Sequence, residues 1–292
     1  MNVLITGSGG QLATELVRTA PGHCRVFDLS LDDLDITREN EVFRLVESVG
    51  PDVIINGSAY TAVDMAEQDE SSARLVNAIG PRNLSRAASK IGCRLVQPST
   101  DFVFDGTDRT PCKPTATPNP LSVYGKTKWE GEMAVIDECS APWTIVRTAW
   151  VYSATGRNFV CSMLNLMKSE TDLRIVDDQH GTPTWARSLA DAIWCLIDRE
   201  IDGIQHWTDE GSTTWYGFAC AIGEIALETG ILRSMPKITP IPTSDYPTPA
   251  SRPAYSVLEK SGTWAALEGT RCMPATDWKE NLRNMMLELK NA

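Results

Sequence analysis

The first residues of the chain constrain its fold most, because an apolar run stops at a cluster of glycines and a helical pattern follows. The order is an apolar run at residues 3–5, then Gly7, Gly9 and Gly10, then a helical pattern from Gln11. This order predicts a strand, a tight turn and a helix. Gly7, Gly10 and Ala13 fit the spacing G-x-x-G-x-x-A. Glycine lets the backbone approach a pyrophosphate closely, and a helix start offers it free N–H groups. A plain glycine turn between strand and helix would give the same letters, but its position so early in the chain favours phosphate binding.

Strand and helix patterns alternate through the first half of the chain. A buried strand is expected to end at Asn56, a helix to cover about 73–90, and the run CRLVQPST to form a strand that ends at Thr100. Thr37 is expected to cap the helix before Pro51. Such alternation predicts the α/β class, with a Rossmann-type doubly wound parallel sheet.

Beyond Tyr152 the alternation fades and segments rich in Pro, Thr and Trp replace it. We therefore expect a nucleotide-binding domain at 1–150, with 183–203 returning to it, and a smaller α/β substrate-binding domain mainly at 151–292. The four prolines of the loop 105–120 predict an ordered, non-helical segment that could cover the site.

Composition excludes several functional classes. The chain has 292 residues, 42% of them hydrophobic, and a formal net charge of −11, which argues against nucleic-acid binding through clustered Lys and Arg. No stretch is apolar enough for a signal peptide or a membrane span, so we expect a cytoplasmic protein that does not bind membranes. The eight cysteines lack C-x-x-C spacing and are interpreted as reduced thiols. The three histidines lie far apart, so no zinc site is expected.

Tyr124 and Lys128 form the most informative pair for chemistry. Four residues apart, they share one face of a helix. A free phenol is a weak acid at neutral pH, but a neighbouring ammonium stabilises the phenolate and favours proton delivery to a carbonyl. Thr100 is expected at the carboxyl end of a strand, where ligands bind in open α/β sheets, and its hydroxyl could hold that carbonyl oxygen. Taken alone, the pair also fits an ordinary solvated helix face, and Thr100 an ordinary turn.

Two carboxylates compete for the adenosine end of a cofactor. Asp28 follows a second apolar run at the distance from the glycine turn where an acidic residue accepts a hydrogen bond from the ribose 2′-hydroxyl, and Asp35 is its rival. A carboxylate at either place would repel a 2′-phosphate. The cofactor is therefore expected to be NADH or NADPH, with a lean to NADH.

With these motifs assembled, the chain resembles the dTDP-4-dehydrorhamnose reductases, which belong to the extended short-chain dehydrogenase/reductases. The resemblance runs nearly from end to end. It is carried by GSGGQLATEL, NGSAYTAVDMAE, STDFVFDG, PLSVYGKTKWEGE, RTAWVY, GRNF, DDQHGTPT, TTWY and YPTPASRP, in that order. So many separate motifs are far more specific than either fingerprint alone.

The resemblance implies reduction of the 4-keto group of dTDP-6-deoxy-L-lyxo-4-hexulose to dTDP-L-rhamnose, the last step of dTDP-rhamnose synthesis. By motif position the catalytic residues would be Thr100, Tyr124 and Lys128. The cofactor would be held by Gly7, Gly10, Gln11, Leu12, Asp35, Ile36, Ser58, Ala59 and Tyr60, with Tyr124 and Lys128 at its nicotinamide end. The substrate would be bordered by Thr100, Asp101, Tyr124, Trp150, Asn158 and Phe159, with Arg252 at its diphosphate.

One departure from the family concerns a metal. In some members, magnesium bridges two subunits through glutamates, and Glu15 occupies one such position, but Arg187 stands where another glutamate would be expected. An arginine cannot ligate magnesium, so no metal is expected, and a metal-bridged homodimer is doubtful.

Two other functions compete with the reductase. A nucleotide-sugar epimerase could use the same Thr, Tyr and Lys, whereas a 4,6-dehydratase would carry an acidic pair directly after the Thr, and here Asp101 is followed by Phe102. The second alternative is not an enzyme but a non-catalytic binding partner that resembles the regulatory β subunit of methionine adenosyltransferase.

Overall fold

A six-stranded parallel sheet forms the centre of the larger lobe in the computed structural model, which describes residues 1–291. Its strand order is β10-β5-β4-β3-β1-β2. The bounds are β1 (Asn2–Thr6), β2 (Arg25–Leu29), β3 (Val53–Asn56), β4 (Arg94–Thr100), β5 (Trp143–Thr148) and β10 (Gly203–His206). From β1 the chain adds β2 on one side and β3 on the other, so the strand order reverses next to the glycine turn. Ligands bind at such a switch point in open α/β sheets.

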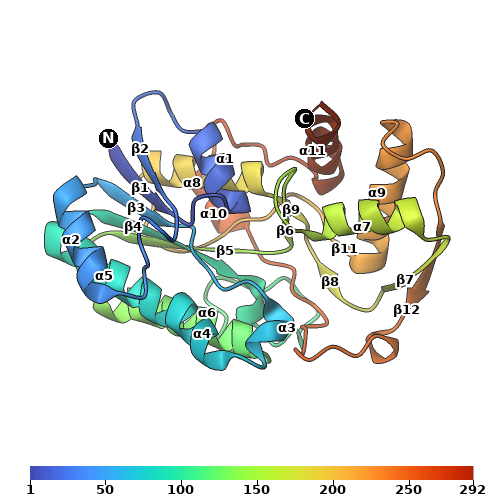
Figure 1. Cartoon of the computed structure of the whole chain (residues 1–292), viewed down its shortest axis with the longest axis horizontal. Helices are drawn as coiled ribbons and strands as arrows, with labels where there is room; N and C mark the ends of the chain where they lie inside the picture. The colour runs from blue at the N-terminus through green and yellow to red at the C-terminus, as the bar shows by residue number, and fades with distance from the viewer. Residues whose placement is uncertain (292) are drawn as a thin grey trace.

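Helices cover both faces of this sheet (Figure 1). Alternating strand residues explain the two layers, because Val3 and Ile5 pack with the helices of one face and Leu4 with those of the other. The first layer contains α1 (Gln11–Arg18) and α8 (Ala186–Asp198), and the second contains α2 (Glu39–Val49), α5 (Gly80–Ile91) and α6 (Val123–Glu138). The expected doubly wound architecture is confirmed.

One helical boundary differs from expectation. Thr37 does not cap α2, because its hydroxyl donates to Asp35 at 2.7 Å and the capping position falls on Arg38. Thr37 instead closes a short turn around the Asp35 carboxylate, and such local turns compete with helix capping for a threonine hydroxyl.

The expected helix at 73–90 contains a π-helical turn. Helix α4 (Glu70–Arg74) runs into the π-turn η1 (Leu75–Ile79) and then into α5. The turn brings the Asn77 carbonyl against α6, where a Cβ on Gly131 would lie 2.1 Å from that oxygen. Gly131 therefore permits the close approach of α6, the helix that carries Tyr124 and Lys128.

The second lobe is built around its own apolar cluster, seen at the right of Figure 1. Its helices are α7 (Phe159–Ser169), α9 (Trp215–Glu228) and α11 (Trp278–Asn291), beside the parallel pair β7 (Asp172–Val176) and β12 (Lys237–Ile241). Short strand pairs join it to the sheet: β6 (Val151–Tyr152) with β9 (Thr184–Trp185), and β8 (His180–Gly181) with β11 (Thr213–Thr214). The remaining short helices are α3 (Val63–Ala66), η2 (Asp101–Val103), η3 (Thr243–Asp245) and α10 (Ser261–Ala266).

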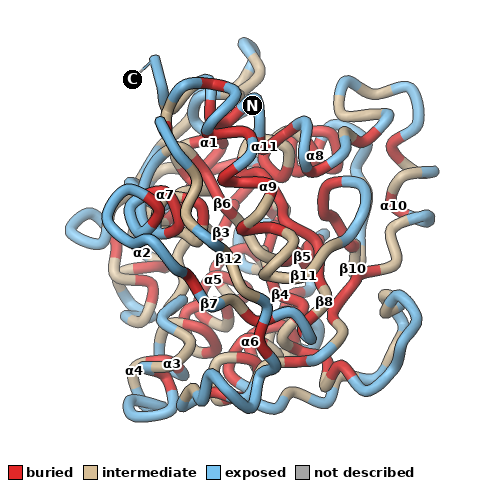
Figure 2. The backbone as a smooth tube through the Cα atoms, turned by 90° about the vertical axis from the view of Figure 1, so that its right-hand side faces the viewer, coloured by how far each residue is buried: buried red, intermediate tan, exposed pale blue. Residues whose placement is uncertain are grey.

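The burial pattern in Figure 2 shows buried backbone running through the central strands and the helices packed on them, with exposed segments outside. No helix within residues 1–291 combines the length and apolar character needed to cross a bilayer. All eight cysteines, each within that range, are free thiols. The division into domains at residue 150 stays a prediction.

Candidate active site

The glycine turn after β1 leaves backbone groups open at the start of α1. Gly7 and Gly9 both have positive φ angles, 78° and 80°. A Cβ at Gly7 would lie 2.6 Å from the Gly57 carbonyl carbon, whereas one at Gly9 would meet no atom within 4 Å. Gly7 thus permits close packing of two strand ends, and Gly9 faces open space beside the helix start. The turn fits a bound pyrophosphate, and Gly9 is a residue to which the fingerprint gave no role.

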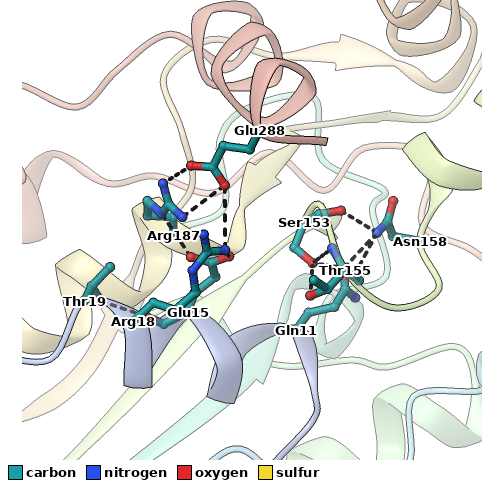
Figure 3. Close-up of polar contacts among 9 residues, drawn as sticks. All are labelled: Gln11, Glu15, Arg18, Thr19, Ser153, Thr155, Asn158, Arg187 and Glu288. Carbon is teal, nitrogen blue, oxygen red and sulfur yellow. Dashed lines mark hydrogen bonds and ion pairs between the residues drawn. The ribbon is translucent and has the colours of Figure 1, made fainter. Parts of the chain in front are cut away.

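Gln11 and Leu12, the first two residues of α1, contact different parts of the molecule. Leu12 packs on the apolar cluster beneath the sheet. The Gln11 side-chain oxygen accepts hydrogen bonds from Asn158 Nδ2 at 3.1 Å and Ser153 Oγ at 3.2 Å (Figure 3). Asn158 also caps α7 by accepting from the Cys161 amide. The start of α1 is therefore attached directly to the second lobe.

The two candidate carboxylates for the adenosine end are held differently. Asp28, at the end of β2, is exposed and accepts the Ser8 hydroxyl at 2.7 Å, so it lies beside the glycine turn. Asp35 accepts from Thr37 and pairs with Arg38 at 3.2 Å. Burial opposes ionisation of Asp35, but these hydrogen bonds outweigh it and lower its pKa.

Ile36, next to Asp35, is a core residue. It is buried, and a Cβ on Gly80 would lie 2.4 Å from its Cδ1 atom. Any contribution of Ile36 to cofactor binding would therefore come from its backbone.

The loop 58–60, expected at the middle of the cofactor, is held by hydrogen bonds from its backbone to buried polar side chains. Its first amide N–H lies 3.2 Å from Asn56 Oδ1 and 3.3 Å from Thr6 Oγ1, and its last donates to Asn77 Oδ1 at 2.9 Å. Asn56 donates in turn to Gln97 at 2.8 Å and accepts from Thr6 at 2.8 Å, which links the ends of β1 and β3 to the middle of β4. The loop is thus held beside the switch point of the sheet.

Thr100, Tyr124 and Lys128 meet at the carboxyl edge of the sheet. Thr100 ends β4, whereas Tyr124 and Lys128 lie one turn apart on α6. Burial raises the pKa of Tyr124 to about 12, against a hydrogen bond with Thr100 that lowers it. Burial lowers the pKa of Lys128 to about 8, and its Nζ donates to the Pro98 carbonyl at 2.9 Å. The arrangement places the Tyr124 phenol beside the Thr100 hydroxyl, with Lys128 one helical turn further along α6.

A buried ion pair, which the sequence reasoning did not identify, supports these residues. Glu132 lies one turn beyond Lys128 on α6, and its charge opposes the lowering of the Lys128 pKa. Its carboxylate accepts from Arg147 Nη2 at 2.6 Å and from Ser99 Oγ at 2.5 Å. The spacing 124, 128, 132 was the available signal, because every fourth residue shares a helix face.

Trp150 is held in an unusual conformation where β5 leads into the second lobe. Its φ angle is +47°, rare for a residue with a side chain. The indole stacks on Trp215 with ring centroids 3.6 Å apart, and a Cβ on Gly181 would lie 2.5 Å from it. Phe159 lies 4.7 Å from the same Trp215 ring. An aromatic wall thus joins Trp150 and Phe159 through Trp215, to which sequence reasoning gave no role.

Arg252 is half-buried and forms an ion pair with Asp64. Its Nη2 is 2.8 Å from Asp64 Oδ2, and its Nη1 donates to Thr248 Oγ1 at 2.5 Å. Asp64 belongs to α3, which follows the loop 58–60. The candidate for the diphosphate is therefore oriented by a carboxylate from α3.

These features define a class of protein. A parallel sheet with a glycine turn at its switch point, and a Thr, Tyr and Lys at its carboxyl edge, are the parts of an extended short-chain dehydrogenase/reductase fold. The model of one protein family, the RmlD substrate binding domain, matches residues 1–291 of the chain. The chain therefore belongs to this family.

Relatives agree over nearly the full length. The chain is 39% identical over 292 residues to a dTDP-4-dehydrorhamnose reductase of Burkholderia thailandensis, covering 96% of each chain. It is 40% identical to a probable dTDP-4,6-dihydroxy-2-methyloxan-3-one 4-ketoreductase of Streptomyces antibioticus, covering 97% of this chain and 94% of that one.

Two solved structures are similar throughout. A dTDP-4-dehydrorhamnose reductase of Clostridium acetobutylicum superposes with a TM-score of 0.92 at 40% identity, covering 99% of this chain and 100% of that one. The Bacillus anthracis reductase, solved in complex with NADP, gives 0.91 at 33% identity, covering 98% and 99%.

Proposed function

We propose that this protein reduces the 4-keto group of dTDP-4-dehydro-L-rhamnose to give dTDP-L-rhamnose. The observation that carries the proposal is the placement of Thr100 at the carboxyl end of β4 with Tyr124 and Lys128 on α6, at the same edge of the sheet as the glycine turn after β1. Relatives with two different substrate names share reduction of a 4-keto group on a dTDP-sugar, which supports the reaction class more broadly than the particular sugar.

A reduced nicotinamide supplies the hydride when it is bound. The glycine turn, with its open space at Gly9, fits the pyrophosphate, and Asp28 lies beside the turn where the adenosine ribose would bind. We infer that the remaining binding positions are Gly7, Gly10, Gln11, Leu12, Asp35, Ile36, Ser58, Ala59 and Tyr60. Asp28 and Asp35 support a preference for NADH, because a carboxylate repels a 2′-phosphate.

Helix α6 supplies the proton that the reduction requires. The Tyr124 hydroxyl delivers it to the 4-oxygen as the carbonyl carbon is reduced, and the phenolate left behind is stabilised by the Lys128 ammonium. Lys128 is buried and Tyr124 is partly buried, and electrostatic interactions are stronger in such surroundings than in water. Thr100 donates a hydrogen bond to the same oxygen and holds it beside the phenol.

The sugar nucleotide would lie along the second lobe. Trp150 and Phe159 offer an apolar wall for the deoxysugar, Asn158 would be a polar neighbour with the buried Asp101 behind Thr100, and Arg252 would bind the diphosphate. A homodimer, a cytoplasmic location and independence from magnesium stay predictions.

The test is oxidation of reduced nicotinamide when purified protein meets freshly made dTDP-4-dehydro-L-rhamnose, with Tyr124→Phe as control. Stoichiometric oxidation that the substitution abolishes is the expected result. An epimerase would form product without net oxidation, because it recycles its cofactor. A regulatory subunit would show no turnover and would copurify with a larger enzyme.

A further inference from the structure

The hydroxyl group of Thr100 has too few hydrogens for its neighbours. A threonine hydroxyl carries one hydrogen and two acceptor lone pairs. The Phe102 amide donates to Thr100 Oγ1 at 3.2 Å and occupies one lone pair. The Thr100 hydroxyl donates to Asp101 Oδ1 at 3.1 Å, and it also lies close enough to Tyr124 to lower the pKa of that phenol. One hydrogen and one lone pair must therefore serve Asp101 and Tyr124.

The charge of Asp101 decides how they are shared. An ionised carboxylate only accepts, so it takes the Thr100 hydrogen and leaves Tyr124 a lone pair. In that state Thr100 cannot donate to a ketone oxygen beside the phenol. A protonated Asp101 donates to Thr100 instead, which frees the Thr100 hydrogen to point at Tyr124 or at the ketone.

The surroundings of Asp101 favour the neutral acid. The residue is 1% exposed, and its Oδ2 atom has no hydrogen-bond partner among residues 1–291. An isolated buried carboxylate is costly unless it is paired with a cation, and no Lys or Arg acts on its pKa. Burial raises this pKa to about 6, against hydrogen bonds from Ser256 and Thr100.

The Asp101 charge shifts the pKa of two titratable groups, and both groups are uncharged when protonated. They are Tyr124 on α6 and Cys112 on the loop 105–120, and a negative Asp101 raises the pKa of each. The segment that carries Ser256 brings a hydroxyl but no charge against the carboxyl. Within residues 1–291 no cation offsets the negative charge of Asp101, which is stabilised only by hydrogen bonds from the Ser256 and Thr100 hydroxyls and from backbone amides.

We propose that Asp101 is a positioning residue for the reduction, and that Thr100 donates to the ketone only while the Asp101 carboxyl is protonated. The inference rests on the proposed function. No proton leaves Asp101 during the step. The hydride adds to the carbonyl carbon, the oxygen takes the Tyr124 proton, and the resulting phenolate accepts the Thr100 hydrogen bond.

The direct test is the pH dependence of kcat, at saturating ketosugar and reduced nicotinamide, in the wild type and in Asp101→Asn and Asp101→Ala. The asparagine amide can donate to Thr100 at every pH, and alanine cannot take the Thr100 hydrogen. Above the pKa of Asp101 in the complex, wild-type kcat should fall about tenfold per pH unit. Both variants should lose that limb and keep only a decline at higher pH from Lys128. Profiles of the same shape in all three proteins would overturn the proposal.

A second measurement needs no substrate. Phenolate absorbance is titrated in the cofactor-bound protein, and the Tyr124 contribution is isolated by subtracting Tyr124→Phe. Asp101→Asn should lower the Tyr124 pKa, because the Asp101 charge raises it. Asp105→Asn, which alters a partly exposed carboxylate on the adjoining loop, is the matched control and should leave the Tyr124 pKa unchanged.

The two measurements separate the two possible failures. If no ketosugar is turned over but the titration shifts, the proposed function fails while the contact between Asp101 and Tyr124 stands. If turnover proceeds with unaltered pH profiles and the titration is unmoved, the function stands and the role of Asp101 is wrong.

Discussion

The guanidinium of Arg187 donates to the fully buried carboxylate of Glu15, with Nε 3.0 Å from Oε2. Its other nitrogens pair with Glu288 on the C-terminal helix α11 (Figure 3). Arg18 completes the cluster at 3.1 Å from Glu15. The chain thus places its own cation between two acidic side chains from α1 and α11, and this arrangement leads to two predictions.

The first concerns stability. Arg187→Met should lower the free energy of unfolding by about 2–4 kcal/mol, because it leaves Glu15 buried with only Arg18 as a partner. Urea denaturation measures the change. Arg199→Met, at an exposed position just beyond the same helix, is the control and should change stability by less than about 0.5 kcal/mol. Equal effects of the two substitutions would show that the cluster adds nothing.

The second concerns magnesium. Activity should be unchanged by a chelator and by added magnesium, because the Arg187 and Arg18 guanidiniums already balance the charges of the two glutamates. Arg187→Glu, which places three carboxylates together, should instead gain a thermal midpoint that rises with magnesium. Wild-type activity lost in chelator and restored by magnesium would contradict the prediction.

Lys128→Met should abolish turnover and yet stabilise the fold at neutral pH. The folded pKa of about 8 lies below the ordinary 10.5, so below pH 8 the folded state bears the full cost of a buried ammonium. Its removal should be worth up to about 3 kcal/mol. Between pH 8 and 10.5 the unfolded chain binds the extra proton, so wild-type stability should rise and the gap should close. Denaturation at several pH values tests this, with exposed Lys126→Met as control.

Arg252→Ala should raise the KM for the sugar nucleotide about 10–100-fold, because a charge-assisted hydrogen bond to a phosphate is worth about 1.5–3 kcal/mol. The KM for the nicotinamide should hardly change. Asp64→Asn should act in the same direction but less, since it loosens the guanidinium without removing it. Arg174→Ala, which breaks an exposed pair with Asp245, is the matched control. Unchanged kinetics in Arg252→Ala would remove the residue from the site.

Turnover should be more efficient with NADH than with NADPH, as judged by kcat/KM for each. Asp28→Asn removes the carboxylate beside the glycine turn and should shift the ratio toward NADPH. A strong NADPH preference in the wild type would show that neither Asp28 nor Asp35 faces the 2′ position.

Local rules allowed much of the fold to be predicted from the sequence. The end of β3 at Asn56 and the arrival of β4 at Thr100 follow from apolar runs with clear breaks. The stacking of Trp150 on Trp215 could not be predicted, because it needs Gly181 from a third distant segment. The π-turn at 75–79 was also beyond reach, since it depends on how closely α6 packs and not on a local propensity. For the ion pair of Glu132 with Arg147, helix spacing indicates only Glu132, because Arg147 lies on the distant strand β5.

Strand β10 lies at the edge of the central sheet beside β5, and α8 packs against α1, although both follow the first segments of the second lobe in sequence. The second lobe is therefore not built from one continuous stretch of the chain. A chimaera that borrows a relative's substrate specificity would need two separate inserts, with the stretch from α8 through β10 kept from the host. A single cut after β5 would leave the host sheet without its last strand and expose a bare parallel edge.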